Sequence, residues 1–304
     1  MPRDTWLARF EKALIKQDLA ETTIKGYLGD VRLFCRWLDD IHAETADLGA
    51  VEIADLRAYR QYLVNQQRQK PAAVNRRLQA LRRFFAWAKR TGLIEDNPAE
   101  SIRFRRKPSP QQPSALTQQE VHALLRVAGQ SPHGLAKRNY ALVQLMLQAG
   151  LRVSEVCRLQ QRDLQLSERS GRVSVIDGKG HKERDVPLNA TARRALARYL
   201  ETREALQLNE PVFASKRGTP LSVRALQKTV AELASRAKIE RIPVTAHTLR
   251  HTFARRYLDA NPGNLVELAT LLGHESLDTT AIYTKAAKET LAGAVERSEL
   301  NMYG

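Results

Sequence analysis

The chain has 304 residues, 43% of them hydrophobic, which is enough for two domains with packed cores. Lysine and arginine number 49 against 33 aspartate and glutamate, and this net charge of +16 favours a polyanionic partner, most commonly DNA. No apolar run reaches the roughly 20 residues that span a bilayer, and residues 1–4 lack the apolar core of a signal peptide. We therefore expect a soluble, intracellular protein with no membrane partner. Two cysteines, Cys35 and Cys157, exclude a disulfide framework.

Four amphipathic helices are predicted in the first 90 residues, because apolar side chains recur there at helical spacing. They cover residues 6–14, 24–38, 53–63 and 74–88. Four short helices of this kind predict a compact helical domain.

The fourth of these helices carries an unusual charge. From Lys70 to Lys107 there are 11 Lys or Arg residues against three acidic ones. A charged run is most often only a solvated helix face. Here the excess is one-sided and lies beside an apolar stripe, which favours a helix that docks on a phosphate backbone or in a groove. The candidate contacts are Arg76, Arg77, Arg82 and Arg83.

Residues 101–113 interrupt the helical pattern with three prolines, which predict an extended linker because proline stops helices. Its basic half includes Arg105 and Arg106, which we expect to follow DNA phosphates. The predicted division is a helical domain at 1–107, a linker at 108–115 and a second domain at 116–304. Up to residue 107 there are 21 Lys or Arg against 14 acids, and after it 28 against 19, so both parts are expected to contact DNA.

The second domain is predicted to mix helices with a small hairpin. A Thr-x-x-Glu capping box at 117–120 begins its first helix, and the almost wholly apolar run 141–149 predicts a buried one. Residues 172–176 alternate like a strand, 177–180 form a turn, and 183–187 return as a second strand. Helices are expected at 191–204 and 223–238.

Two basic residues of this domain are candidates for phosphate binding. Arg152 follows a glycine turn at a helix start, where backbone amides favour an anion, and Glu155 can brace its guanidinium. Lys179 lies between two glycines at the hairpin tip. Taken singly, the first pair is more often a surface ion pair and the second a polar turn. The glycine spacing does not fit a nucleotide-binding P-loop.

Residues 247–252 place His247, Arg250 and His251 on one helical face. Histidines four residues apart can bind zinc, but the intervening glutamate of metalloproteases is missing and Arg250 repels a cation. We therefore expect neither a metal nor another cofactor. His274 follows a glycine at a helix end, and Tyr283 lies nine residues later. Singly these would be a helix cap and a core tyrosine, but the whole order of residues makes a complete set for phosphoryl transfer.

These motifs resemble the tyrosine recombinase (phage integrase) family, in particular Xer-type recombinases. The resemblance covers nearly the whole chain and no catalytic position departs from the family pattern. No arm-binding domain precedes Trp6, which disfavours an arm-site-dependent phage integrase. The motifs that carry the resemblance are residues 149–155, 178–180, 247–252, 272–274 and Tyr283, together with 74–76, 84–88 and 97–99.

The resemblance implies a mainly α protein of two domains, a helical core-DNA-binding domain and an α-rich catalytic domain with a small antiparallel sheet, which form a C-shaped clamp on duplex DNA. It implies that Tyr283 attacks a backbone phosphate to give a 3′-phosphotyrosine and a free 5′-hydroxyl. Arg152 and Arg250 would bind the phosphate oxygens, and Lys179 would protonate the leaving oxygen. The resemblance also implies that His274 contacts the phosphate and that His247 is the favoured proton acceptor for Tyr283. Glu155 would support the residues that bind the phosphate without contacting the phosphate itself.

The family also implies an assembly of four protomers on two duplexes that carry specific recombination sites. The tetramer would contain one kind of chain or a related recombinase as partner, with accessory proteins as further candidates. Residues 286–300 would be a helix that docks on a neighbouring protomer, although such a helix can also pack on its own domain. The site is expected to work without metal or ATP in the cytoplasm, at the nucleoid, in DNA integration and excision or in the resolution of replicon dimers.

Two other functions compete with this hypothesis. A type IB topoisomerase uses the same chemistry on one duplex, but the Xer-like amino-terminal half argues against it. A regulator that clamps DNA without cutting it is disfavoured by the intact catalytic set.

Overall fold

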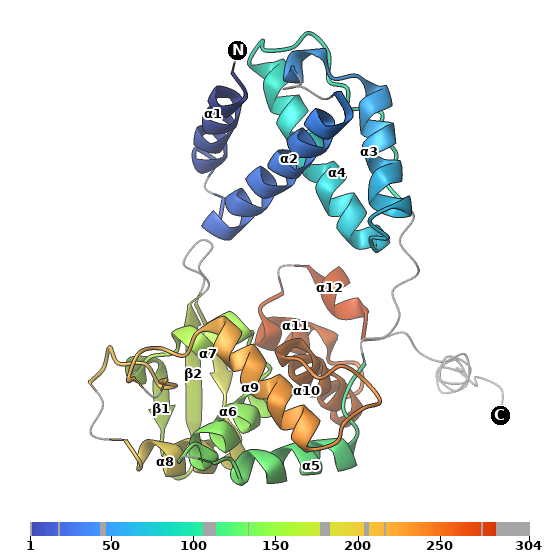
Figure 1. Cartoon of the computed structure of the whole chain (residues 1–304). Helices are drawn as coiled ribbons and strands as arrows, with labels where there is room; N and C mark the ends of the chain where they lie inside the picture. Colours follow the sequence, from blue (N-terminus) through green and yellow to red (C-terminus); the bar gives the residue numbers. More distant parts are fainter. Residues whose placement is uncertain are drawn as a thin grey trace, which may run out of the picture. The chain divides into compact units, whose positions relative to one another are not determined.

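The structure, a computed structural model, describes residues 2–17, 19–42, 47–105, 114–132, 134–176, 183–203, 207–215, 217–274 and 276–283. The chain divides into two compact units, residues 1–110 and 111–304 (Figure 1). The mainly helical class and the small antiparallel sheet that the sequence predicts are confirmed. None of the described helices is long and apolar enough to cross a membrane.

The described residues of the amino-terminal unit form four helices and one short 3₁₀ turn, at Leu48–Ala50. All four predicted helices are present: α1 (Arg3–Ile15), α2 (Glu21–His42), α3 (Ile53–Asn65) and α4 (Pro71–Arg90). Pro71 begins α4 at a position where the helix needs no amide hydrogen bond. The core is rich in aromatic rings that meet edge to face, such as Phe10 with Phe84 and Phe34 with Tyr59.

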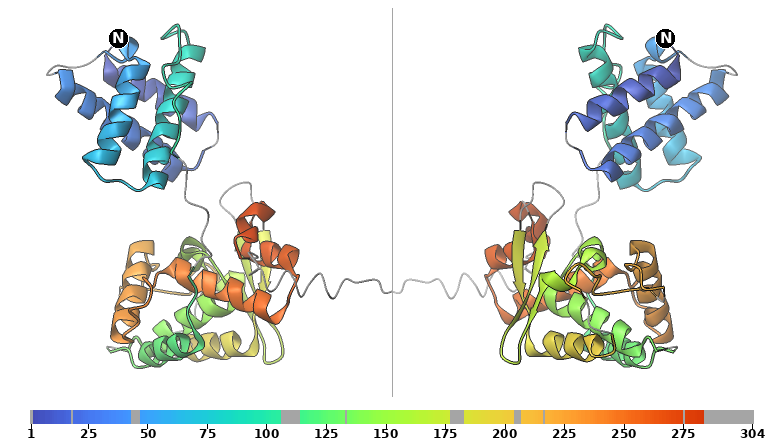
Figure 2. Two further views of the ribbon diagram at one scale, coloured as in Figure 1. Left: turned by 90° about the vertical axis from the view of Figure 1, so that its right-hand side faces the viewer. Right: turned by 90° about the vertical axis from the view of Figure 1, so that its left-hand side faces the viewer.

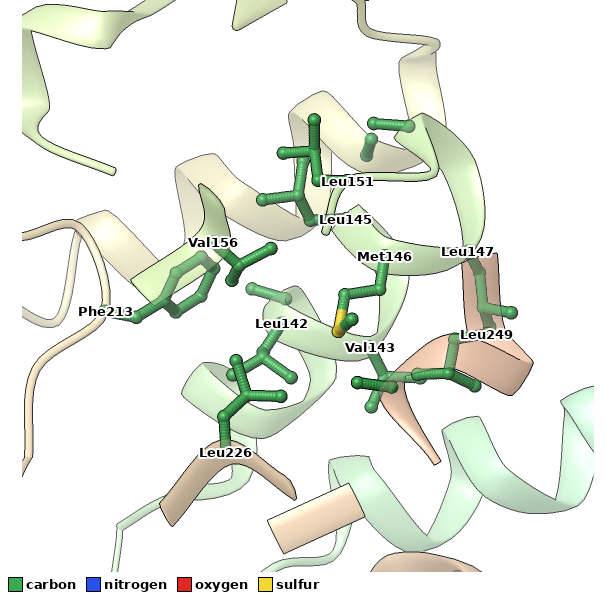
Figure 3. Packing of buried hydrophobic residues seen from close by; sticks show 14 of the residues in the cluster. Leu142, Val143, Leu145, Met146, Leu147, Leu151, Val156, Phe213, Leu226 and Leu249 are labelled. Atoms are coloured by element: carbon green, nitrogen blue, oxygen red, sulfur yellow. The ribbon is translucent and has the colours of Figure 1, made fainter. Parts of the chain in front are cut away.

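The carboxy-terminal unit is built around one helix that is buried on almost every side, α6 (Ala136–Ala149). Figure 3 shows Leu142 of this helix facing Leu226, and Val143 facing Leu249. The surrounding helices are α5 (Gln118–Gly129), α7 (Val153–Arg158), α8 (Ala190–Leu200), α9 (Val223–Arg236) and α10 (Ala246–Ala260). A helix surrounded by others needs apolar side chains on nearly every side, which explains the almost wholly apolar run in its sequence.

A three-stranded antiparallel sheet, in the order β1-β2-β3, completes this core. The strands are β1 (Leu164–Leu166), β2 (Gly171–Ile176) and β3 (Glu183–Pro187). The two predicted strands are confirmed and pair antiparallel, with Val173 opposite Val186, while the predicted turn at 177–180 lies outside the described residues. Strand β1 is too short to be recognised from its sequence. The hairpin lies beside α11 (Leu265–Leu272), as Figure 2 shows, and the Arg184 Nε donates to the Leu271 carbonyl at 3.0 Å.

A separate small apolar cluster lies under the last described residues. It contains Ala254, Leu268, Leu272 and Tyr283, with Phe253, Tyr257, Leu258 and Ile282 partly buried around them. A last short helix, α12 (Leu277–Ala281), leads into Tyr283. This cluster therefore fixes the position of the tyrosine that the sequence predicts to be the nucleophile.

Candidate active site

Two glycines place the chain at the site. Helix α6 ends at Gly150 and α11 at Gly273, both in the left-handed conformation, with φ of 62° and 65°. A Cβ atom at Gly150 would lie 2.2 Å from the Phe253 ring, and one at Gly273 would lie 2.8 Å from Arg184. Only glycine fits both the conformation and the space. The turns deliver Arg152 and His274 to the same place.

Arg250 lies in the middle of α10 and is only 3% exposed. Its guanidinium donates to the carbonyls of Gly150 and Leu272, each at 2.7 Å, and to Nε2 of His274 at 3.0 Å. Among the described residues no carboxylate forms an ion pair with it. Burial, with Arg152 nearby, lowers the pKa of Arg250 to about 10, so it remains a cation at neutral pH. A buried cation held only by neutral acceptors keeps its charge available for an anion.

Arg152 approaches the same point from the start of α7. Its guanidinium donates to the Gly273 carbonyl at 2.6 Å and to Glu155 at 2.8 Å. Glu155 also accepts two bonds from Arg184, at 3.0 and 2.9 Å. Burial raises the pKa of the Glu155 carboxyl, but the bonds from Arg184 and Arg152 more than offset it and the pKa lies below its ordinary value. Glu155 is thus a carboxylate that holds Arg152 in place.

His274 joins Arg250 to the segment that carries the tyrosine. Because its Nε2 accepts from Arg250, its Nδ1 bears the proton and donates to the Thr280 hydroxyl at 2.7 Å. Burial and the two neighbouring arginines lower the pKa of His274 to about 4, so the ring is neutral. Thr280 is fully buried, and its carbonyl accepts the Tyr283 amide at 3.0 Å.

Tyr283 is buried, with 6% of its surface exposed. Its hydroxyl lies 2.5 Å from Nδ1 of His251, one turn along α10 from His247. Burial raises the pKa of the Tyr283 phenol, and Arg250 lowers it only in part. The ring of His247 stands edge-on to His251, with the ring centres 5.0 Å apart, and no described contact joins it to Tyr283.

Four of the six predicted catalytic residues, Arg152, Arg250, His274 and Tyr283, are thus linked by direct contacts or through one intervening side chain or carbonyl. His247 joins them through the His251 ring. Lys179, Arg106 and the segment 286–300 lie outside the described residues. Strand β3, which follows the segment of Lys179 in the sequence, is held at the site because its Arg184 bonds to Glu155.

The predicted DNA-binding arginines of α4 all contact their own unit. Arg76 donates to both oxygens of Asp30, at 2.5 and 2.8 Å, and Arg77 lies 3.9 Å from the same carboxylate. Arg82 donates to the Glu100 carbonyl at 3.0 Å, and Arg83 to Gln17 at 2.5 Å. Arg105, a predicted DNA contact that follows α4, is held through its backbone. Its amide donates to the side-chain oxygen of Asn75, and its carbonyl accepts from the side-chain nitrogen of Asn75, each at 2.8 Å. Much of the Arg76 side chain remains exposed, at 57%.

Sequence reasoning missed three residues of the site: His251, Arg184 and Thr280. His251 was considered only as a zinc ligand, because spacing along the chain cannot show a contact with a residue 32 positions away. Arg184 looks like an ordinary charged residue of a strand. Among the described residues, no group of three or more His, Cys, Asp or Glu side chains converges as metal ligands do.

Comparisons with known proteins agree with this geometry. Residues 114–290 match the phage integrase family, and residues 7–92 match the phage integrase N-terminal SAM-like domain. Tyrosine recombinase XerD of Ralstonia nicotianae is 35% identical over 291 residues, which cover 94% of this chain and 91% of that protein. Tyrosine recombinase XerC of Vibrio vulnificus is 38% identical over 231 residues, 75% of this chain and 71% of that one.

The fold has solved counterparts as well. The XerH site-specific recombinase, in a pre-cleavage complex with its difH substrate, superimposes with a TM-score of 0.75 at 22% identity, over 96% of this chain and 84% of that one. A family match to more than half of the chain and relatives above 30% identity decide the assignment. The chain belongs to the phage integrase family and is a Xer-like tyrosine recombinase, a site-specific DNA recombinase.

Proposed function

We propose that Tyr283 cleaves one strand of duplex DNA by attacking a backbone phosphate, which forms a 3′-phosphotyrosine and releases a 5′-hydroxyl. The observation that supports this most strongly is the convergence of a buried phenol with two guanidinium groups, of which Arg250 has no carboxylate partner among the described residues. The covalent bond preserves the energy of the phosphodiester, so a 5′-hydroxyl from another strand can reverse the step without ATP.

The two arginines would stabilise the charge that develops on the five-coordinate phosphorus. Each offers a planar set of donors to the non-bridging oxygens, a task that metal ions perform in many nucleases. In this proposal His274 also contacts the phosphate, as the family resemblance implies; in the free protein its ring lies between Arg250 and Thr280. Lys179 protonates the leaving 5′-oxygen, as the family resemblance implies, and Glu155 orients Arg152.

The division of labour along the chain is also part of this proposal. Residues 1–107 would bind the core of the recombination site, 108–115 would link the units, and 116–304 would carry the chemistry. With both units basic, the two would close as a C-shaped clamp on the duplex. Arg76, Arg77, Arg82, Arg83, Arg105 and Arg106 are the proposed backbone contacts. Many phosphate contacts release many counterions, so affinity should fall steeply with salt.

Strand exchange needs four active sites, so we propose a tetramer on two duplexes. The relatives include proteins named XerC and XerD, which makes a mixed tetramer with a related chain as reasonable as a homotetramer. Residues 286–300 would dock on the neighbouring protomer. The biological task would be the integration and excision of DNA elements or the resolution of replicon dimers, at the nucleoid.

The test is a covalent trap. The protein is incubated, without metal or ATP, with nicked duplexes that carry imperfect inverted repeats from the host replicons, and the products are separated on a denaturing gel. We expect a protein–DNA adduct that Tyr283→Phe abolishes. The matched control is Tyr257→Phe, a tyrosine of the same apolar cluster that bonds to Glu267 instead, and it should still form the adduct.

Other outcomes separate the competing functions. Relaxation of supercoils with no recombinant product from any site would support a topoisomerase. Tight binding without an adduct on any duplex would contradict the enzymatic proposal and leave a protein that only clamps DNA.

A further inference from the structure

The hydroxyl of Tyr283 already has a hydrogen-bond partner, and that partner is not one of the six predicted catalytic residues. It is the imidazole of His251, whose Nδ1 lies 2.5 Å from the hydroxyl oxygen. The two rings are tilted by 57° with their centres 5.6 Å apart, so they meet at the polar atoms and not face to face. Such a short distance places both atoms within reach of direct proton transfer.

We infer that His251 is the proton acceptor for Tyr283 in the cleavage step. This inference rests on the proposed function, since it assigns a role within the same reaction. A phenol can donate its one proton to a ring nitrogen that lacks hydrogen, or its oxygen can accept from a ring N–H. Proton transfer from Tyr283 to His251 requires the first arrangement. His251 must then carry its own proton on Nε2 and present the Nδ1 lone pair to the tyrosine.

The other two histidines are less suitable for this task. Nε2 of His274 receives a bond from Arg250 and its Nδ1 donates to Thr280, so neither nitrogen has a lone pair for the phenol. The described contact of His247 is an edge-on approach to the His251 ring, and it leads to the tyrosine only through that ring. His251 therefore has the only described imidazole nitrogen in contact with the nucleophile.

The charges around His251 keep it ready in the free protein. Burial, with His247 and Arg250 beside it, lowers the pKa of His251 to about 4, so at neutral pH the lone pair is not blocked by a proton. The same burial raises the pKa of the Tyr283 phenol, so the proton stays on the tyrosine until substrate arrives. A phosphate bound to Arg250 offsets the positive charge that faces His251 and makes the ring a stronger base.

The step balances without any further reactant. The bond from the tyrosine oxygen to phosphorus forms, the bond from phosphorus to the 5′-oxygen breaks, and the phenolic proton moves to Nδ1 of His251. The departing 5′-oxygen takes a proton from Lys179. In rejoining, a 5′-hydroxyl attacks phosphorus and gives its proton back to Lys179, the bond from phosphorus to the tyrosine oxygen breaks, and the tyrosine recovers its proton from His251.

Single-turnover cleavage of the nicked duplex found by the covalent trap tests this inference. His251→Ala should lower the cleavage rate by about 10²- to 10⁴-fold, the range expected for general base catalysis, with DNA affinity unchanged. His251→Asn places an amide oxygen near the position of Nδ1, so it can orient the hydroxyl without taking its proton, and it should be equally slow. His122→Ala, an exposed histidine of α5, is the control for the substitution itself and should cleave at the wild-type rate.

Two readouts separate proton transfer from a structural role. Added imidazole should restore part of the His251→Ala rate, in proportion to its neutral form, because it can enter the space that the side chain leaves. A duplex with sulfur in place of the bridging 5′-oxygen needs no proton on its leaving group. It should therefore relieve a Lys179→Ala defect but not a His251→Ala defect.

The outcomes that overturn the inference are distinct from failure of the proposed function. If wild type forms the adduct and His251→Ala cleaves as fast or faster, the contact only holds the tyrosine at rest. Full activity of His251→Asn would reduce His251 to a positioning residue, and rescue by imidazole of His247→Ala instead would return the role to His247. In the free protein, ¹⁵N NMR should find His251 protonated on Nε2, and protonation on Nδ1 would contradict the mechanism. Absence of an adduct with wild type would instead refute the proposed function.

Discussion

The two units treat buried charge in opposite ways. In the amino-terminal unit a buried acid, Asp30, is 2% exposed and faces two arginines that reach it from α4. In the carboxy-terminal unit a buried base, Arg250, is 3% exposed and faces backbone carbonyls and one neutral imidazole. In the first arrangement the charge of the buried residue is neutralised within the fold, and in the second it is not. Arginines whose charge is balanced serve mainly the fold, whereas an unbalanced buried arginine is ready for an anionic substrate.

Replacing Arg250 should have the largest effect on DNA cleavage, and it tests the contrast between the two units most directly. Arg250→Ala removes a donor from the phosphate, and we expect single-turnover cleavage to fall by about 10³-fold or more, with duplex binding little changed. Arg250→Lys should cleave almost as slowly as Arg250→Ala, because one ammonium group cannot reach Gly150, Leu272 and His274 together.

The matched control comes from the other unit. Arg82→Ala should weaken DNA binding and lower the salt dependence by about one counterion, while cleavage of the bound duplex keeps its rate. A comparable loss of cleavage in both variants would show that an arginine of the amino-terminal unit also takes part in the chemistry.

Glycine substitutions test whether the site depends on its two left-handed turns. Gly150→Ala should lower the free energy of unfolding by about 2–5 kcal/mol, since it adds a clash with Phe253 to the cost of the left-handed conformation. Gly92→Ala shares a positive φ, 69°, but meets nothing within 4 Å, so it should cost only about 1–2 kcal/mol. Urea denaturation of both variants measures the difference. Equal losses would show that space at Gly150 is not limiting.

Removal of the buried acid should have a moderate effect. Asp30→Asn leaves Arg76 and Arg77 without a carboxylate, and we expect unfolding to become easier by about 1–2 kcal/mol, since Arg76 can turn to water. The released charge should tighten non-specific binding to duplex DNA and steepen its salt dependence. Weaker binding by Asp30→Asn would show instead that the acid positions these arginines for DNA.

The pH dependence of stability tests the two buried histidines of the site. His251 and His274 each have a pKa of about 4 in the fold, below the ordinary 6.5, so between these values the unfolded chain binds more protons. Stability is therefore expected to fall as the pH drops from 6.5 towards 4. In thermal melts across this window, His274→Asn should flatten the decline, and His122→Asn should leave it unchanged. An unaltered slope in His274→Asn would argue that this ring does not resist protonation.

Sequence patterns predicted the parts of this molecule that depend on local spacing. Helical periodicity located α1 to α4, and the almost wholly apolar run located α6. The order of motifs selected Arg152, Arg250, His274 and Tyr283, which the structure brings together. Periodicity and short motifs are both properties of residues that lie near one another in the sequence.

Contacts between distant segments could not be predicted in the same way. Asp30 lies on α2, 46 residues from Arg76, and no spacing rule pairs them. The sequence alone therefore does not show that two arginines of α4 face a carboxylate of their own unit. The contact of His251 with Tyr283 depends on where α12 ends over α10. The role of Arg184 depends on how the sheet meets α11. Such relations arise from packing, which a single sequence does not display.

The atoms that hold Arg250 have a consequence for how relatives of this chain can diverge. Two of its three acceptors are main-chain carbonyls, those of Gly150 and Leu272, and point mutations do not exchange main-chain atoms. Side chains around the guanidinium can therefore change during evolution while the two carbonyls that bind it remain in place. What selection must retain is small: two helices that end in a left-handed glycine turn and a third helix that presents an arginine between them.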